Sequence, residues 1–181
     1  MICGIDESGR GPLAGPLVLA GVVLNKSVYK LNDSKKLTKK ERESLFEKIK
    51  KNSSYKIVII DNMDIDKNGL SFSINSALKE ILLSLDAKEY IFDGNSNFGV
   101  SGIKTVIKAD QKIKEVMAAS ILAKVTRDDI MCKLSLKYPQ YNFCKHKGYA
   151  TKEHIELIKK YGYCKIHRKS YKLKSLQPTL F

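Results

Sequence analysis

Acidic residues follow three apolar, strand-like runs of the chain. They are Asp6 with Glu7 after the first run, Asp93 after the second and Asp110 after the third. If these strands are neighbours, their carboxyl ends bring Asp6, Asp93 and Asp110 together, at the edge where open α/β sheets place their sites. A cluster of carboxylates is unfavourable unless a cation neutralises it, and Mg²⁺ prefers carboxylate oxygens. Four carboxylates can hold two such ions and clamp both oxygens of an in-line phosphoryl displacement.

A simpler interpretation of these acids stays open at this point. Aspartate often ends a strand because its side chain favours turns. Asp61 follows the apolar run 55–60 in the same way, and nothing in its position alone separates it from the other three. The positions therefore indicate a metal site without establishing one.

The loop after the first strand, residues 6–16, is more distinctive. Its two adjacent acids are followed by Gly9, Arg10 and Gly11. Glycines let the backbone come close to a ligand, and the planar guanidinium of Arg10 matches a phosphate or a sugar hydroxyl. A tight loop with a surface arginine is the alternative. The phosphate-binding pattern GxxxxGK[ST] is absent from the sequence.

The remaining pattern predicts one α/β domain that would position these residues. Strands are expected at residues 2–6, 17–24, 55–60, 89–93 and 105–108. A capping box at Thr38 and Glu41 opens a helix that ends near residue 51. Helical spacing of apolar residues predicts further helices at 70–85, 113–136 and 151–161, and the segment 117–123 is apolar nearly all round, hence buried.

The charge of the chain indicates a polyanionic partner. The 181 residues contain 33 Lys and Arg against 19 Asp and Glu, a net charge of +14. Residues 1–110 carry 17 bases and 14 acids, whereas residues 111–181 carry 16 bases and 5 acids. Such a gradient suits nucleic acid, although 29 of the bases are Lys, which also fits codon bias or solubility. No stretch is long and apolar enough to predict a membrane span.

The cysteines and histidines predict neither disulfides nor a zinc site. Cys3, Cys132, Cys144 and Cys164 form no CxxC pair, and no signal sequence precedes the first strand. We therefore expect a reduced, cytoplasmic chain with free thiols. The three histidines are not paired on one helix face, which makes them poor metal ligands.

Several motifs in order along the chain resemble the ribonuclease HII family, the type 2 ribonucleases H. The motifs cover residues 4–16, 33–37, 93–95, 108–110, 118–128, 146–149 and 166–168. Ser8 departs from the family pattern, in which Ala is usual. The resemblance implies an α/β, ribonuclease-H-like fold, with a mixed central sheet of about five strands flanked by helices. It places a catalytic domain at 1–170, with a basic helical part at 111–170, and a tail at 171–181.

The resemblance also implies an activity. Members of the family cut the RNA strand of RNA–DNA hybrids and incise duplex DNA 5′ to single embedded ribonucleotides, leaving 3′-hydroxyl and 5′-phosphate ends. The matching metal ligands are Asp6, Glu7, Asp93 and Asp110. Two divalent ions, Mg²⁺ or Mn²⁺, would activate a water and stabilise the leaving 3′-oxygen. The alternatives are another metal-dependent nuclease of this fold that acts on DNA, and a non-catalytic hybrid-binding protein.

The same resemblance assigns residues to the substrate. Gly9, Arg10 and Gly11 would recognise the ribose 2′-hydroxyl, which distinguishes RNA from DNA. Tyr149 would stack beneath the deoxyribose that follows the ribonucleotide. The remaining residues expected near substrate phosphates are Ser34, Lys35, Lys145, His146, Lys147 and Arg168.

Two further features concern the surroundings of the site and a partner. Asp128 lies one helical turn after Lys124, so the two are expected to pair and to support the site rather than to bind metal.

The last five residues, with Gln177, Leu180 and Phe181, resemble the peptides by which bacterial replication proteins bind the sliding clamp; an apolar end that folds back is the alternative. We expect the chain to be a monomer.

Overall fold

The computed structural model describes residues 1–29, 31 and 37–172 of the chain. The strands within these residues are β1 (Ile2–Ser8), β2 (Leu17–Leu24), β3 (Ser53–Ile60), β4 (Glu89–Asp93) and β5 (Ile103–Val106). The α-helices are α1 (Lys39–Asn52), α2 (Asn62–Asn68), α3 (Leu70–Ser84), α4 (Lys114–Lys137), α5 (Phe143–His146) and α6 (Lys152–Tyr161). Two short 3₁₀ helices are η1 (Ala109–Gln111) and η2 (Pro139–Tyr141).

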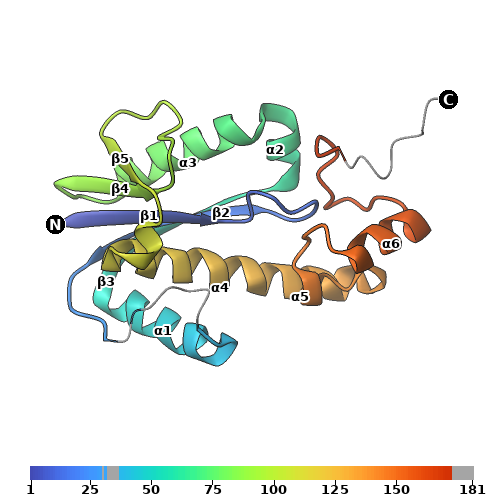
Figure 1. The fold of residues 1–181 in the computed structure, drawn as a ribbon, viewed down its shortest axis with the longest axis horizontal. Coiled ribbons are helices and arrows are strands. Elements are labelled where there is room, and N and C mark those ends of the chain that lie inside the picture. Colours follow the sequence, from blue (N-terminus) through green and yellow to red (C-terminus); the bar gives the residue numbers. More distant parts are fainter. Residues whose placement is uncertain (30, 32–36, 173–181) are drawn as a thin grey trace.

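One mixed sheet forms the centre of the molecule, with the strand order β3-β2-β1-β4-β5 (Figure 1). Strand β2 runs antiparallel to both of its neighbours, β1 and β3, whereas β1, β4 and β5 run parallel to one another. In the β1–β4 pair Ile5 lies opposite Phe92, so the next residues, Asp6 and Asp93, follow side by side at the ends of the paired segment. The predicted α/β class with a mixed sheet is therefore confirmed.

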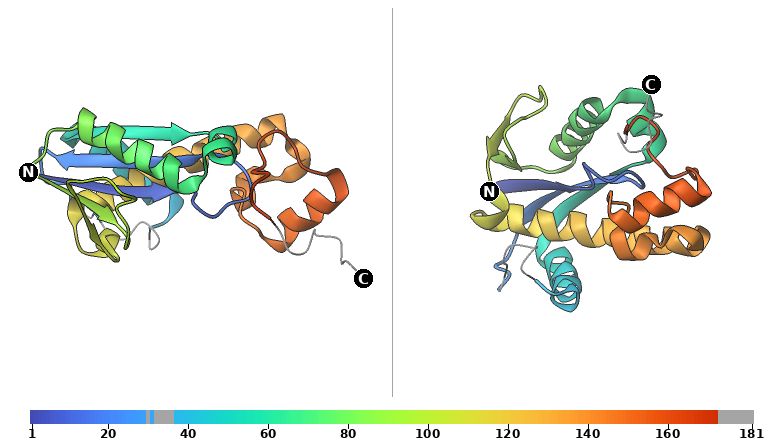
Figure 2. Two further views of the ribbon diagram at one scale, coloured as in Figure 1. Left: turned by 90° about the horizontal axis from the view of Figure 1, so that it is seen from above. Right: turned by 45° about the vertical axis from the view of Figure 1, so that its right-hand side comes forward.

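Helices cover both faces of the sheet (Figures 1 and 2). Helix α3 packs its buried residues, such as Ile74 and Ile81, against one face. Helices α4 and α1 cover the other face, where Ala119 and Leu122 meet β2. The first turn of α4 lies directly on β1: a Cβ atom at Gly4 would stand 2.2 Å from the backbone of Glu115 and Val116. This close approach sets the distance between the buried helix and the strand that carries Asp6.

A smaller helical part adjoins the carboxyl end of β1 (Figure 2). Its helices α5 and α6 pack with the end of α4 around a third apolar cluster that includes Met131, Tyr141 and Phe143. The loop between β1 and β2 reaches this part, where Leu13 donates its N–H to the carbonyl of Gly148 at 2.8 Å. The two parts of the chain therefore meet at the loop that follows the first acids.

Most predicted elements are confirmed, with shifts at their ends. The capping box at Thr38 and Glu41 is present, and Thr151 caps α6. The strand predicted at residues 105–108 lies two residues earlier, as β5 at Ile103–Val106. Residues 107 and 108 lead into η1 instead, and Lys108 has a left-handed φ of 57°. Helices α2 and α5 were not predicted, since each is too short to show a helical period in the sequence.

The structure separates Asp61 from the other strand-end acids. Its carboxylate accepts a hydrogen bond from the N–H of Asp64 at 2.8 Å and so caps α2. Strand β3, which it follows, lies two strands away from β1. The turn interpretation is thus correct for Asp61 and does not apply to Asp93.

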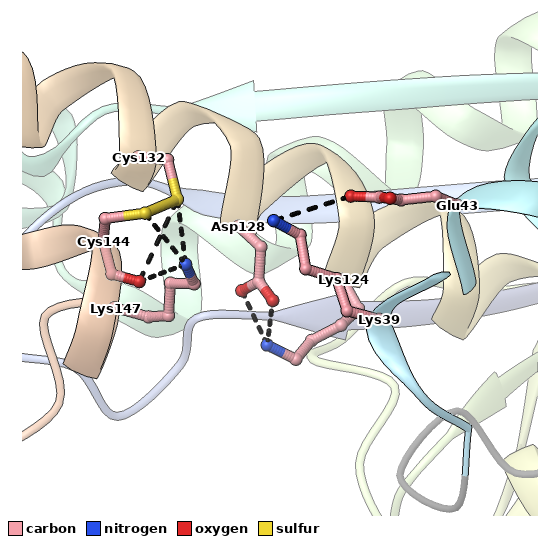
Figure 3. Close-up of a disulfide and its surroundings, with 7 residues drawn as sticks. All are labelled: Lys39, Glu43, Lys124, Asp128, Cys132, Cys144 and Lys147. Carbon is pink, nitrogen blue, oxygen red and sulfur yellow. Dashed lines mark hydrogen bonds and ion pairs between the residues drawn. A yellow bond between two sulfur atoms is a disulfide. The ribbon is translucent and has the colours of Figure 1, made fainter. Parts of the chain in front are cut away.

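The expectation of four free thiols is wrong for two of them. Cys132 of α4 and Cys144 of α5 form a disulfide, with their Cα atoms 4.0 Å apart (Figure 3). The packing of α5 on the end of α4 brings the two together, which their separation of twelve residues does not indicate. Cys3 and Cys164 are free. A search of the described residues finds no helix that is both long and apolar enough to cross a membrane.

Candidate active site

Three of the predicted acids meet at the carboxyl end of the parallel strands. Asp6 follows the part of β1 that pairs with β4, Asp93 ends β4, and Asp110 lies in η1 just after β5. Each offers one carboxylate oxygen within 4.8 Å of the other two, the one such group of at least three potential metal ligands among the described residues. Asp93 is oriented by η1, because its carboxylate accepts the N–H of Ala109 at 2.7 Å.

The electrostatics of this group favour a cation. Asp6 is 6% exposed and Asp110 is 2% exposed. Burial raises the pKa of Asp6 well above its usual value, and the neighbouring Glu7 and Asp93 raise it further, against a hydrogen bond from Ser120 that lowers it. Without a counter-charge, ionising Asp6 is therefore costlier than ionising an aspartate in water. A divalent cation would neutralise the same carboxylates, and hard oxygen donors are the ligands that Mg²⁺ and Mn²⁺ prefer, so the donor set fits such ions.

Glu7 lies beside this group and not within it. Its carboxylate pairs with the guanidinium of Arg10 at 2.7 Å. The guanidinium of Arg10 also lies 5.4 Å from the ring centre of Phe98. The geometric group therefore contains three of the four predicted ligands, and the carboxylate of the fourth, Glu7, is paired with Arg10 in the same cavity.

A cavity of about 530 Å³ opens beside the acids. Its lining includes residues from β1, the following loop, β4, α4 and the segment after α5. These residues include Asp6, Glu7, Asp93, Lys124 and Tyr149, together with the loop Gly9–Arg10–Gly11. The structure therefore brings Asp6, Glu7 and Asp93 to one cavity with the predicted sugar-reading residues, and Asp110 lies next to them.

Arg168 supports the loop after β1 from the interior of the protein. Its burial corrects the expectation that it contacts phosphate. Its side chain is fully buried. It donates to the carbonyls of Gly9 at 2.7 Å, Arg10 at 3.1 Å and Gly15 at 3.0 Å. The guanidinium is thus occupied by backbone carbonyls of the very loop that was expected to bind the sugar.

Arg127 is a supporting residue that the sequence analysis did not single out. It is fully buried and donates to the carbonyls of Ala14 at 3.1 Å, Pro16 at 2.9 Å and Lys147 at 3.0 Å. Its guanidinium lies 5.6 Å from the ring centre of Tyr149, so it backs the exposed tyrosine of the cavity. A signal existed in the sequence, since Arg127 continues the apolar stripe of α4 one turn after Ala123.

Ser120 is a second residue that the sequence analysis missed. It lies on the same stripe of α4, is 7% exposed and hydrogen-bonds to the carboxylate of Asp6. A single hydroxyl within an otherwise apolar helical segment was the available signal.

The three histidines form a buried cluster behind the cavity, which corrects the expectation that His146 approaches phosphate. His146 donates from Nε2 to the carbonyl of Tyr141 at 2.7 Å and accepts the N–H of Gly148 at Nδ1. Nε2 of His154 and Nε2 of His167 are 3.1 Å apart, and the His146 and His154 rings stack. The cluster holds the segment before Tyr149 in place.

The neutral form of this cluster satisfies its hydrogen bonds. His154 donates from Nδ1 to the carbonyl of Tyr149, and His167 accepts the N–H of Cys164 at Nδ1, so one proton remains for the contact between the rings. Burial is the main cause that lowers the pKa of His154 and of His167 to about 4.

The three lysines near the cavity, Lys124, Lys145 and Lys147, each have a different kind of partner. Lys124 binds both carboxylate oxygens of Asp128 at 2.6 Å, which leaves Asp128 outside the three-acid group (Figure 3). Lys145 pairs with Glu153 at 2.8 Å and stays largely exposed. Lys147 points its ammonium at the disulfide. Ser34, Lys35, Gln177, Leu180 and Phe181 lie outside the described residues.

Comparison with known families and proteins gives a consistent result. A family model described as Ribonuclease HII matches residues 3–174. A curated Ribonuclease HII of Campylobacter hominis is 58% identical over 181 residues, covering 99% of this chain and 98% of that relative. A Ribonuclease HII of Sulfurovum sp. is 54% identical, covering 99% and 96%.

Solved structures agree in fold. The PCNA:RNase HII complex from Archaeoglobus fulgidus contains a chain that matches with a TM-score of 0.82 and 27% identity, covering 93% of this chain and 92% of that one. The ribonuclease H2 from Pyrococcus horikoshii matches with a TM-score of 0.76 and 28% identity, covering 94% and 93%.

Replacing Arg127 tests the support of the loop. Arg127→Met leaves three buried carbonyls without their donor, and we expect the free energy of unfolding to fall by about 3 kcal/mol. The matched control is Lys133→Met on the same helix, where the exposed pair with Asp129 contributes less than about 1 kcal/mol. Urea unfolding of both variants measures the difference, and equal losses would contradict the supporting role.

The histidine cluster predicts a pH dependence of stability. Because the pKa values of His154 and His167 are about 4 in the folded chain and near 6.5 when unfolded, the unfolded chain binds more protons between these values. The contribution to stability is complete above about pH 6.5 and falls, on the order of 3 kcal/mol for the coupled pair, as the pH drops towards 4. The free energy of urea unfolding should decline more steeply over this range than in His154→Gln. Parallel curves would show that the cluster does not exclude protons.

Proposed function

The chain belongs to the ribonuclease HII family and is a ribonuclease H endonuclease for RNA–DNA hybrids, and on that premise we propose that it also incises duplex DNA 5′ to single embedded ribonucleotides. The products would carry 3′-hydroxyl and 5′-phosphate ends, and the activity would serve the removal of ribonucleotides from replicated DNA. The observation that carries the proposal is the cavity that Asp6, Glu7 and Asp93 share with the Gly9–Arg10–Gly11 loop, next to Asp110. The ribose that is recognised and the phosphodiester that is hydrolysed would thereby belong to the same nucleotide step.

The family depends on divalent metal, and we infer that two ions, Mg²⁺ or Mn²⁺, are held here. Asp6, Asp93 and Asp110 are the ligands that the geometry supports, and Glu7 lines the same cavity as the fourth. When bound, such ions supply a more acidic water and stabilise charge on the leaving 3′-oxygen. The carboxylates must be ionised to bind them, so metal binding and proton release from Asp6 are coupled.

The chain's own residues would select and orient the substrate. Backbone groups of Gly9–Arg10–Gly11 would contact the 2′-hydroxyl, since Arg168 holds this loop rigidly from the opposite side. The ring of Tyr149 is 42% exposed in the same cavity and would stack on the sugar that follows. Lys145 and Lys147 would contact phosphates, as would Ser34 and Lys35.

Removing one ligand tests the metal-dependent incision. We expect Asp6→Asn or Asp93→Asn to lower the rate on a duplex with one ribonucleotide by at least about a thousandfold, because a ligand contributes several kcal/mol of transition-state stabilisation. The matched control is Asp61→Asn, a strand-end acid that caps α2, where Asn is an equally good cap and activity should persist. Cleavage sites are mapped on a sequencing gel with and without Mg²⁺ or Mn²⁺.

Three outcomes of that experiment would contradict the proposal. The first is the lack of any metal-dependent cut 5′ to the ribonucleotide. The second is cleavage of an all-DNA duplex at the same rate, which would favour a DNA-directed nuclease of this fold. The third is full activity of Asp6→Asn, which would remove the carboxylates from the chemistry.

We further propose that the tail binds a sliding clamp and that the chain acts as a monomer in the cytoplasm. The support is the sequence of residues 177–181 and the solved complex of an archaeal relative with PCNA. Gln177 would bond at the edge of an apolar pocket that Leu180 and Phe181 fill.

Deletion of residues 177–181 tests the tail. Clamp binding, measured by surface plasmon resonance, should be lost, while hybrid cleavage without the clamp should be unchanged because residues 177–181 include none of the proposed metal ligands or substrate-binding residues. A double variant, Leu180→Ala with Phe181→Ala, should behave like the deletion. Unchanged affinity of either variant would refute the clamp contact.

A further inference from the structure

The disulfide between Cys132 and Cys144 lies close to the proposed nucleic-acid surface. It joins the last third of α4 to α5, and α5 leads directly into Lys147 and Tyr149 (Figure 3). The carbonyl of Lys147 is held by Arg127, and Tyr149 lines the catalytic cavity. The disulfide therefore anchors the start of the segment 147–149, which is proposed to contact the substrate.

Lys147 contacts the sulfur atoms themselves. Its ammonium is 3.0 Å from Sγ of Cys132 and 3.7 Å from Sγ of Cys144, and it also donates to the carbonyl of Cys144. An adjacent cation stabilises a thiolate, which is the reactive form of cysteine in thiol–disulfide exchange. The reduced pair would therefore react readily with an oxidant.

The charged groups around this ammonium come from several elements. Asp128 on α4 attracts it, whereas Lys124, Lys39 and Arg127 repel it. With the cysteines oxidised, Lys147 faces neutral sulfur. With them reduced, it would face a thiolate and pair with it.

The pair is accessible from solvent, unlike Cys3. Cys144 is exposed and Cys132 is half-buried, and both line a cavity of about 560 Å³ between α1 and the end of α4. Cys3 is fully buried, and burial raises the pKa of its thiol to about 12. Burial also raises the pKa of Cys164. Cys164 is half-buried and does not line this cavity, so the cavity gives a small oxidant access to Cys132 and Cys144 together.

We propose that Cys132 and Cys144 form a reversible redox site, and that closing the disulfide strengthens the contact of Lys147 with duplex phosphates. This coupling rests on the proposed role of Lys147 in substrate binding. Oxidation removes the thiolate that competes with phosphate for the ammonium. It also ties α5, and with it the segment that carries Lys147, to α4.

The chemical step needs a low-molecular-weight disulfide as oxidant. One cysteine thiolate attacks it, forms a mixed disulfide and releases one small thiol. The second cysteine thiolate attacks the mixed disulfide, forms the Cys132–Cys144 bond and releases the second small thiol. Two protein thiols are oxidised, the oxidant is reduced to two thiols, and the two protons leave with them.

The first experiment needs no substrate. The full chain is treated with oxidised glutathione or with dithiothreitol, and thiols are counted after denaturation. We expect two of the four thiols to disappear on oxidation and to return on reduction, with Cys132 and Cys144 joined in the peptide map. The melting temperature of the oxidised chain should be about 5–10 °C higher. Loss of no thiol, or pairing of other cysteines, would overturn the proposal.

The second experiment measures affinity for an RNA–DNA hybrid without divalent metal, in both redox states. Oxidation should tighten binding about fivefold at low salt, the gain of one exposed charge contact, and less at high salt. The variant Cys3→Ser with Cys164→Ser should respond like the unaltered chain. The variant Cys132→Ser with Cys144→Ser should not respond, and Lys147→Gln should form the disulfide but lose the gain in affinity.

The outcome of these two experiments can be distinguished from the outcome of the incision assay that tests the proposed function. Equal affinity in both redox states, or weaker binding after oxidation, would overturn the coupling. Incision at single ribonucleotides is read on a different duplex, so its failure would leave the thiol count, the melting temperature and the hybrid affinity as independent measurements.

Discussion

Two buried guanidiniums that bind backbone carbonyls hold the catalytic side of this molecule together. A charged group is costly to bury unless it finds hydrogen-bond acceptors, and every guanidinium nitrogen of Arg127 and of Arg168 donates to a carbonyl of the loop after β1 or, for Arg127, to that of Lys147. A shift of this loop would break these hydrogen bonds and leave two buried positive charges without acceptors. It is therefore coupled to α4 and to the end of the described chain, although more than a hundred residues separate the partners.

The carboxylates present the opposite electrostatic problem. Asp6 and Asp93 are brought together by the parallel register of β1 and β4, and Asp110 is added by the turn of η1. Their mutual repulsion and burial are tolerable only with a proton or a cation. The same region thus contains two guanidiniums that bind backbone carbonyls and a group of carboxylates that would attract metal, and the Gly9–Arg10–Gly11 loop contacts the first and lines the cavity of the second.

Sequence patterns predicted the elements with a strong local signal. The capping box at Thr38 and the apolar repeat of α3 depend on neighbours in the chain, and both are confirmed. Asp61 and Asp93 look alike in sequence, and only strand order separates a helix cap from a member of the acidic group. The basic excess of residues 111–181 was also overestimated as a surface feature, since Arg127 and Arg168 belong to it and are buried.

The sequence by itself determined the family and the α/β class, because motifs and apolar repeats consist of residue types at short spacings, and the family resemblance singled out Asp6, Asp93 and Asp110. Tertiary structure decided which charged and polar groups face solvent. It buried Arg168 and His146, turned Glu7 towards Arg10 and joined Cys132 to Cys144. The physical reason is that burial and hydrogen-bond partners are set by contacts between segments far apart in the chain, which no local pattern encodes.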